Sequence, residues 1–460
     1  MNANPIPNYT GIAATLLLVL TLTNTSASVV PAPSAILSLT KTNTRAVTLS
    51  IGNAGDQGWI IISSSNLTSW TEVESLKVFN GNYRRSYTNP AVGNIFYRAF
   101  FDVARQTITS TTTNALLLPA TSFNYAAPVL PANFLVNPIL AEDNTPANDF
   151  TTDAGATLGR VLFYDKRLST NQTISCSSCH QQAHGFSDPH RFSTGFDGSV
   201  GTRNSMGLSN ARWYQRKHFF WDERANTLED QTLMPIQNPS EMGMTLEALT
   251  NRLAAEPFYT NLFTLAFGSP AVTTNRIARA LAQFVRSIVS TQSKYDLGLT
   301  NNFTNFTAQE NQGRQIFFGP PGGPPGACAA CHGTDNFTPG PALNNNGLEF
   351  PYVDQGVGGV TGTAGDNGKF KVPSLRNIDL TAPYMHDGRF TNLEQVVDFY
   401  STGVVDNPNL SPPLRTPGGG VLRLNFTTSQ KVALVAFLRT LTDTKLVNDA
   451  KLSDPFNYGD

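Results

Sequence analysis

The chain has 460 residues, a formal net charge of −1 and only 14% charged residues, against about 25% in ordinary soluble proteins. This balance excludes the basic excess that attracts nucleic acid or an anionic membrane surface. With 40% hydrophobic residues the chain can bury several cores, whereas its four cysteines are too few for a disulfide framework of this length.

A signal peptide is predicted over residues 1–28. The apolar run from Gly11 to Leu22 has the length of a secretory h-region, and small polar residues after it suit cleavage near Ala27 or Ser28. The segment before the run carries no Lys or Arg, which departs from the usual signal, so an uncleaved anchor or a buried helix is the alternative. We therefore expect export to the periplasm or the cell surface of a bacterium.

Residues 34–118 are predicted to form an all-β, sandwich-like module. Apolar Val47, Leu49 and Ile51 alternate with polar neighbours, and stretches rich in Gly and Asn separate this run from others of the same kind. The phrases SSNLTSWTEV and FYRAFF resemble a β-module attached to exported bacterial proteins, for which a spacer role and a docking role are both open. The stretch 119–138 is predicted to be a linker.

From residue 139 the hydrophobic period becomes helical. Long loops rich in Gly, Pro and Asn separate the predicted helices, which suits a core filled partly by a large cofactor. Thr427 and Gln430 form a predicted capping box before an apolar run. The apolar residues predicted to share a helical face are Leu246, Leu249 and Leu253 in one segment, and Ile277, Leu281, Phe284, Val285 and Ile288 in another.

The cysteines identify that cofactor. They occur as Cys176-Ser-Ser-Cys179-His180 and Cys328-Ala-Ala-Cys331-His332, and Cys-x-x-Cys followed at once by His is the attachment motif of c-type haem. The four thiols are expected to bond two haems, with His180 and His332 as the proximal ligands of the irons. Structural zinc also uses two Cys-x-x-Cys pairs, but about 15–20 residues apart, and a thioredoxin-like motif needs a βαβ context that this sequence lacks.

The sequence around both motifs resembles the bacterial di-haem cytochrome c peroxidase family, which includes MauG. The resemblance covers about residues 130–460. It implies two mainly α, cytochrome c-like domains after the β-module: a peroxidatic domain at 139–300 and an electron-transferring domain at 301–460. The stretches that carry it include LGRVLFYDKRLSTNQTISCSSCH, FFWDERANTLEDQTLMPIQNPSEMGM and VPSLRNIDLTAPYMHDGRFTNLEQVVDFY.

The resemblance also implies catalytic roles in the peroxidatic domain. Glu241 matches the distal acid, Gln231 the distal amide, Pro235 the proline over the distal face, and Trp221 the tryptophan between the haems. The residue types suit the chemistry, because a carboxyl group in a partly apolar pocket can move the proton of a bound peroxide. An amide can orient the peroxide without competing for that proton.

A calcium ion between the haems is implied in the same way. Asn204 and the backbone carbonyls of Thr381 and Pro383 match the calcium site of the family, and oxygen ligands supplemented by water suit a hard cation.

The sixth position of the peroxidatic iron departs from many relatives. The place of their distal histidine falls at Phe196 in this sequence. We assign His184 to the proximal side, His190 to a loop and His218 to the rim. An open or weakly held site that needs no reductive activation is therefore the expectation.

The far ligand of the second haem is expected to be Tyr400, which matches the axial tyrosine of MauG, where many peroxidases of the family have Met. Met385 is the competitor, although its turn is expected to be poorly placed to reach the iron. A third alternative is that Tyr400 only ends an amphipathic helix.

The sequence thus predicts a di-haem peroxidase that reduces hydrogen peroxide to water at the His180 haem. Electrons are expected to arrive through the His332 haem from a small redox protein of the cytochrome c or cupredoxin type. The alternatives are a MauG-like oxidase acting on a protein side chain and a non-catalytic di-haem electron carrier. Glu241 and Gln231 disfavour the carrier, which needs no proton-transfer acid. The oligomeric state is open, a homodimer included.

Overall fold

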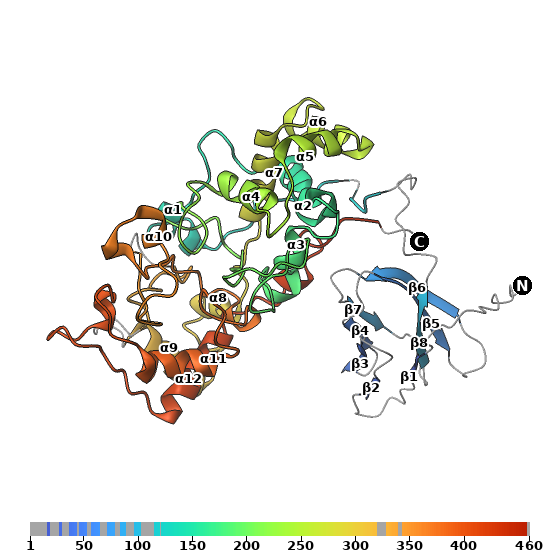
Figure 1. Ribbon diagram of the computed structural model, residues 1–460. Helices are drawn as coiled ribbons and strands as arrows, with labels where there is room; N and C mark the ends of the chain where they lie inside the picture. The colour runs from blue at the N-terminus through green and yellow to red at the C-terminus, as the bar shows by residue number, and fades with distance from the viewer. Residues whose placement is uncertain are drawn as a thin grey trace, which may run out of the picture. The chain divides into compact units, whose positions relative to one another are not determined.

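The computed structural model describes residues 115–119, 121–319, 328–338 and 343–457, together with the backbone of eight strands between Leu16 and Asp102. The chain divides into two compact units, of which one comprises Met1–Leu117 with Phe456–Asp460 and the other Leu118–Pro455 (Figure 1). None of the helices in the described part is long and apolar enough to cross a membrane.

The first unit contains two four-stranded antiparallel sheets, with strand orders β1-β8-β5-β6 and β2-β3-β4-β7. The structure describes only the strand backbones here, so the sandwich-like packing of this module stays a prediction. The predicted signal peptide lies outside the described residues apart from the backbone of β1 and the start of β2. The strands are β1 (Leu16–Leu18), β2 (Ala27–Val29), β3 (Ile36–Asn43), β4 (Ala46–Gly52), β5 (Gln57–Ser64), β6 (Thr71–Val78), β7 (Tyr83–Thr88) and β8 (Phe96–Asp102).

The second unit is mainly helical, as expected for residues after 139. Its α-helices are α1 (Ile139–Glu142), α2 (Asp153–Tyr164), α3 (Cys176–Cys179), α4 (Leu228–Gln237), α5 (Leu246–Ala254), α6 (Pro257–Phe267), α7 (Thr274–Arg286), α8 (Lys294–Leu299), α9 (Ala308–Phe318), α10 (Gly358–Thr361), α11 (Leu393–Asp398) and α12 (Thr428–Arg439). Short 3₁₀ turns join them: η2 (Ala132–Phe134), η3 (Lys166–Leu168), η4 (Gln182–His184), η5 (Ala364–Asp366), η6 (Ile378–Leu380), η8 (Pro412–Leu414) and η9 (Leu446–Asn448), while η7 (Phe399–Gly403) is a π-helical turn.

Two helix crossings organise this unit, and both depend on a glycine. A Cβ placed on Gly159 of α2 would lie 1.9 Å from the carbonyl oxygen of Ala280 in α7, and one on Gly313 of α9 would lie 1.9 Å from that of Ala433 in α12. No larger side chain fits so close a backbone approach. One helix of each pair, α2 or α9, precedes one of the two Cys-x-x-Cys-His motifs, so the same packing occurs once with each motif.

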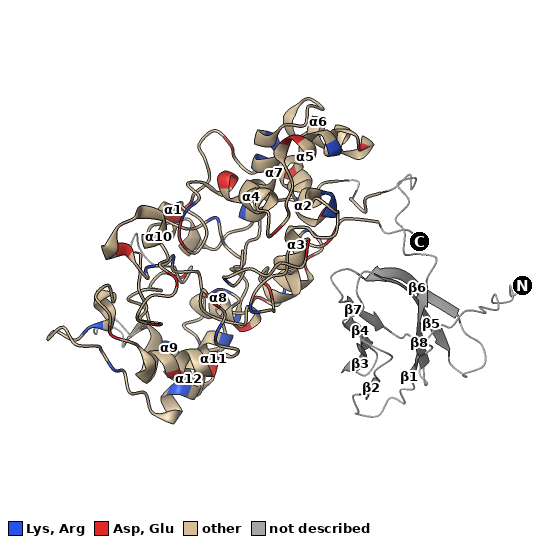
Figure 2. Cartoon of the chain, viewed as in Figure 1, with Lys and Arg blue, Asp and Glu red and all other residues tan. Residues whose placement is uncertain are grey.

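The predicted apolar faces are buried, apart from Leu246 at the start of α5, which is half-buried. In α5 Leu249 and Leu253 are fully buried, and all five predicted residues of the α7 segment are at most 4% exposed. The capping box of α12 is confirmed, because Thr427 and Gln430 each accept a hydrogen bond from the backbone N–H of the other. Acidic and basic side chains are sparse and interspersed over these helices (Figure 2).

The segment predicted to be a linker is packed where the structure describes it. Tyr125 and Phe134 are 2% and 1% exposed, and the Tyr125 hydroxyl donates to the carbonyl of Lys451 at 2.5 Å. Phe134 packs edge-on against Trp213 with ring centroids 4.8 Å apart. The prediction of a linker is therefore wrong for residues 121–138, because their aromatic side chains are buried within the helical unit.

Candidate active site

The first Cys-x-x-Cys-His motif borders a large cavity, called the first cavity below. Cys176 and Cys179 begin and end the short helix α3, and His180 follows it. The cavity holds ≈ 2240 Å³ of empty space, part of it open to solvent. Burial raises the pKa of both thiols to about 12.

The His180 ring is oriented for an axial bond. Its Nδ1 lies 3.0 Å from the carbonyl oxygen of Phe186, and because a carbonyl only accepts, Nδ1 must carry the proton. Burial lowers the pKa of His180, which favours the neutral ring. The lone pair therefore lies on Nε2, as in histidines that ligate a metal through that nitrogen.

The predicted distal residues line the same cavity as His180. Gln231 and Pro235 lie four residues apart on α4 and so share a face. Glu241 lies in the turn after α4, where its Oε1 accepts a hydrogen bond of 2.7 Å from the Asn238 amide. These three residues, which are close in sequence, thus lie in the wall of the cavity that His180 also lines.

Burial raises the pKa of Glu241, an effect that nearby Arg224 and the Asn238 hydrogen bond oppose. A carboxyl group in a cavity, with its pKa raised by burial, is a candidate for holding and releasing a proton during a reaction. Arg224 is itself paired with Asp222 at 2.9 Å, so its charge is shared between two carboxylates.

Of the histidines in the described part of the chain, only His180 lines the first cavity. His190 is 78% exposed and bonded to Asp188 through Nδ1 at 2.9 Å. Phe196, at the place of the distal histidine in many relatives, packs beneath Gly243 instead, and its N–H donates to the Glu241 carbonyl at 2.8 Å.

The second motif borders a second cavity, of ≈ 1760 Å³ including space open to solvent. His332 repeats the geometry of His180, with Nδ1 3.0 Å from the carbonyl oxygen of Phe337. Burial lowers its pKa to about 4. The neutral ring again keeps the Nε2 lone pair available.

Tyr400 and Met385 both line the second cavity. The amide nitrogen of Asn346 lies 3.4 Å from the Tyr400 hydroxyl and 3.5 Å from the Met385 sulfur, so the two candidate ligands are neighbours. Tyr400 belongs to the π-helical turn η7 that extends α11, and π-helical turns are frequent at functional sites. Met385 adopts a left-handed turn, with φ of 75°, and lies beside Tyr400, so Met385 stays a competitor for the far ligand.

Trp221 lines both cavities. Its indole N–H donates to the carbonyl of Asn204 at 2.8 Å, and its own carbonyl accepts from the N–H of Lys371 at 2.8 Å. The ring is thereby held at the boundary between the cavities.

The comparisons with known proteins agree with this geometry. The sequence model of the family described as "Di-haem cytochrome c peroxidase" matches residues 153–303. Cytochrome c551 peroxidase of Nitrosomonas europaea is 35% identical over 72% of this chain and 94% of the relative. The chain belongs to the di-haem cytochrome c peroxidase family.

Other relatives include MauG proteins. The methylamine utilization protein MauG of Methylorubrum extorquens is 34% identical over 64% of this chain and 80% of the relative. The crystal structure of a MauG-like protein associated with microbial copper homeostasis has 32% identity and a TM-score of 0.61, covering 70% of this chain and 98% of that one. The diheme peroxidase BthA of Burkholderia thailandensis, at 24% identity and a TM-score of 0.55 over 68% of this chain and 92% of that one, shares the fold.

The protein is accordingly an oxidoreductase of the cytochrome c peroxidase type, and its family implies two c-type haems. The structure fits that cofactor, because each cavity has its own pair of thiols and its own imidazole with an available Nε2. A zinc site shared by the four cysteines is excluded, since the pairs line different cavities. In the described part of the chain no group of three or more His, Cys, Asp or Glu side chains could hold a metal ion.

The residues predicted to bind calcium line the second cavity of the peroxidase together. The Asn204 amide nitrogen donates to the carbonyls of His190 and Arg191 at 3.1 and 3.2 Å. The amide nitrogen is therefore turned away from any cation, and the Asn204 side-chain oxygen is the ligand atom that remains.

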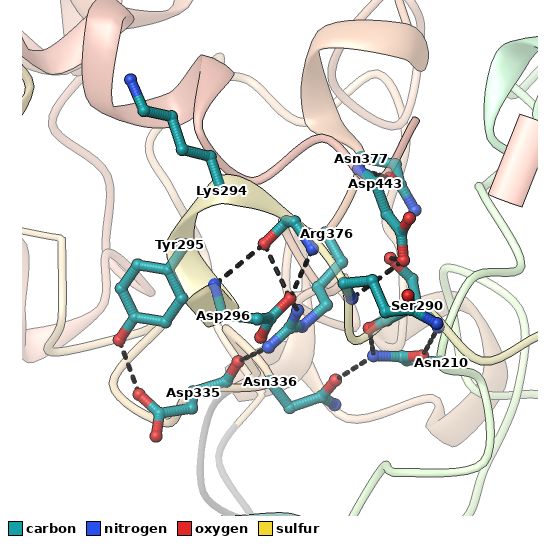
Figure 3. Close-up of polar contacts among 12 residues, drawn as sticks. Asn210, Ser290, Lys294, Tyr295, Asp296, Asp335, Asn336, Arg376, Asn377 and Asp443 are labelled. Carbon is teal, nitrogen blue, oxygen red and sulfur yellow. Dashed lines mark hydrogen bonds and ion pairs between the residues drawn. The ribbon is translucent and has the colours of Figure 1, made fainter. Parts of the chain in front are cut away.

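A buried polar network supports the wall of the second cavity (Figure 3). Arg376, which lines this cavity, is fully buried and donates to Asp296 at 2.6 Å and to the carbonyl of Asp335 at 2.5 Å. Asn336 accepts from Asn210 at 3.0 Å. This hydrogen bond joins the loop of Asn210, in the wall of the first cavity, to the loop after Cys328–His332. It therefore links the walls of the two cavities.

Sequence reasoning missed three residues of the first cavity: Arg224, Asn238 and Lys371. Asn238 stands three residues before Glu241, a short-turn spacing that could have indicated the hydrogen bond between them. Lys371 comes from far along the chain, and no local signal marks it.

Proposed function

We propose that this protein reduces hydrogen peroxide to water in the first cavity, with electrons relayed through the second cavity from a small redox protein of the cytochrome c or cupredoxin type. The observation that carries the proposal is that Glu241, Gln231 and Pro235 line the cavity of His180. The proposal has further support from relatives named as cytochrome c peroxidases.

When bound, the haem supplies an iron that binds peroxide and exchanges electrons. Glu241 would take a proton from one oxygen of the peroxide and return it to the other, which leaves as water. Burial raises the pKa of Glu241, which favours a carboxyl group that can carry the proton between the two oxygens. Gln231 offers an amide that orients the peroxide, and Pro235 limits the space above it.

Trp221 is the proposed path for electrons between the cavities. Its indole lies in the wall of both, and an oxidisable ring at that position shortens each transfer step. Tyr400 is the proposed far ligand in the second cavity, and Met385 is its neighbour and competitor.

A MauG-like oxidase that acts on a protein side chain is the second candidate. It is favoured by the presence of Tyr400 in the second cavity and by similarity to MauG proteins. The oxidised di-haem state distinguishes the two functions: a peroxidase is reduced rapidly by its small donor, whereas the oxidase holds its oxidising equivalents until a protein substrate binds.

The test is peroxide consumption by the haem-loaded protein with a reduced cytochrome c or cupredoxin as donor. Glu241→Gln should keep both haems and lower the rate by about 10²–10⁴-fold, the usual contribution of a general acid–base group. Glu247→Gln, on the exposed first turn of α5 outside the cavity, is the matched control and should react like the parent. Equal rates for Glu241→Gln and the parent would remove Glu241 from the mechanism.

Calcium at Asn204, Thr381 and Pro383 is part of the proposal. Metal analysis of the purified protein before and after a calcium chelator tests it, with one calcium per chain expected before. Export is proposed on the apolar run at Gly11–Leu22, and N-terminal sequencing of the protein recovered from the periplasm tests that.

A further inference from the structure

Tyr214 is a buried tyrosine in the wall of the first cavity. It is 2% exposed and lines the same cavity as His180 and Glu241. Its backbone N–H donates to the carbonyl of Glu142 at 2.8 Å, which fixes its position. The proposed reaction with peroxide uses no tyrosine at this place.

The Tyr214 hydroxyl donates a hydrogen bond to the carboxylate of Glu223. On its other side, Glu223 is paired with the Arg216 guanidinium at 2.7 Å. The phenol therefore has a proton acceptor already in contact. At the potentials that oxidants in proteins reach, a tyrosine loses an electron only if its phenolic proton leaves as well. Glu223 is positioned to accept that proton.

Glu223 occupies a backbone conformation that is unfavourable for a side chain. Its φ is 56°, in the left-handed region that glycine favours, and its side chain is only 4% exposed. Residues held in this region without being glycine cluster at functional sites. The strain places a carboxylate, rather than a glycine, beside Tyr214.

Lys371 adds a charge to the other side of the phenol. Its ammonium nitrogen lies 3.8 Å from the centre of the Tyr214 ring, and burial lowers its pKa to about 8. A cation against the ring disfavours a positively charged, still protonated tyrosine radical. Electron loss from Tyr214 is therefore coupled to proton loss.

We propose that Tyr214 is a redox-active residue that gives one electron to the peroxide-oxidised haem centre of the first cavity and its proton to Glu223. The inference rests on the proposed function, which supplies the oxidant. Hydrogen peroxide takes up two electrons and two protons to give two water molecules, and Tyr214 provides one of the electrons. The phenolic O–H bond breaks, an O–H bond forms on Glu223, and a neutral tyrosyl radical remains. An electron from the external donor and the proton held by Glu223 then restore the phenol.

The chain contains a matched control. Tyr259 is also fully buried, its hydroxyl donates to Asp165 at 2.6 Å, and Asp165 is paired with Arg167 at 3.2 Å. Tyr259 thus has the same chain of contacts from phenol to carboxylate to guanidinium as Tyr214. It lines neither of the two cavities described above. Replacing it removes the same hydrogen bond at a place without an oxidant.

The experiment uses the protein loaded with both haems, mixed with one equivalent of hydrogen peroxide, frozen rapidly and examined by electron paramagnetic resonance. The parent should give a radical signal whose hyperfine structure narrows when the protein contains ring-deuterated tyrosine. Tyr214→Phe should lower the yield of this signal at least tenfold, whereas Tyr259→Phe should keep it. Glu223→Gln, which keeps the shape but removes the base, should slow its formation by about tenfold or more.

Absorption spectra recorded in parallel separate the possible failures. If peroxide changes the haem spectrum but the radical is insensitive to deuterated tyrosine, or survives in Tyr214→Phe, the inference is overturned while the proposed function stands. If peroxide leaves the haem spectrum unchanged, both are overturned. If Tyr214→Phe does not bind both haems, the labelled parent and Glu223→Gln decide: a tyrosyl radical that forms as fast in Glu223→Gln as in the parent overturns the inference.

Discussion

Replacement of Glu142 by Gln should change how stability depends on pH. The Glu142 carboxyl is 2% exposed and accepts a hydrogen bond of 2.7 Å from Thr338, a residue of the first cavity wall. Burial raises its pKa from 4.5 to about 7. The folded protein therefore keeps a proton that the unfolded chain releases, and stability is lost as the pH rises from 4.5 to 7.

The size of this loss follows from the shift. One pKa unit corresponds to about 1.4 kcal/mol, so the shift of Glu142 corresponds to about 3 kcal/mol over the whole window. Gln cannot ionise, and Glu142→Gln should not lose this stability. The free energy of unfolding of the parent, relative to that of the variant, should fall by about 3 kcal/mol between pH 4.5 and 7.5 and be constant above that.

Urea unfolding of the haem-loaded protein measures this difference, followed by haem absorbance at each pH. Glu247→Gln removes an exposed carboxyl and should give a profile parallel to the parent. Parallel profiles for the parent and Glu142→Gln would refute the reasoning, because they would mean that the Glu142 carboxyl has the same pKa in the folded and unfolded chains.

Because burial raises the pKa of Glu241, the rate of the peroxide reaction should rise as this carboxyl group loses its proton, at a pH above the ordinary glutamate value of 4.5. A stopped-flow pH profile of Glu241→Gln should lack this rise. In ferric absorption and magnetic resonance spectra, Tyr400→Phe should change the ligand field of the second haem whereas Met385→Leu should not; the reverse result would assign the ligand to Met385. Gly159→Ala forces a Cβ to within 1.9 Å of a carbonyl oxygen and should lower the free energy of unfolding by about 1–3 kcal/mol. Gly365→Ala, where an added Cβ meets nothing within 4 Å, is its control in thermal unfolding.

Much of the candidate site could be predicted because its residues belong to short sequence motifs, or lie close together in the chain. The Cys-x-x-Cys-His motifs have a fixed local geometry, and Gln231, Pro235 and Glu241 follow one another on α4 and the turn after it. A spacing along a helix and its following turn converts directly into a position in space.

Other features depend on contacts between distant segments. Met385 lies beside Tyr400 because of a left-handed turn, and a sequence pattern does not predict a positive φ at methionine. Tyr125 and Phe134 look like linker residues until the surface that buries them is known. Lys371 contacts Tyr214 although the two residues are far apart in the chain. A single sequence carries no signal for such a contact.

The two glycine-dependent helix crossings bear on how the two haem centres can be altered independently. Gly159 against Ala280 and Gly313 against Ala433 are the same solution to the same packing problem, and Phe284 and Phe437 stand at equivalent places beside them. The helix pairs α2–α7 and α9–α12 thus use one packing arrangement, whereas the residues that line the two cavities differ. Glu241 and Gln231 line the first cavity, and Tyr400 and Met385 line the second. Because these cavity residues lie outside the two helix pairs, either site can be engineered while the helix pairs and their glycine contacts are kept unchanged.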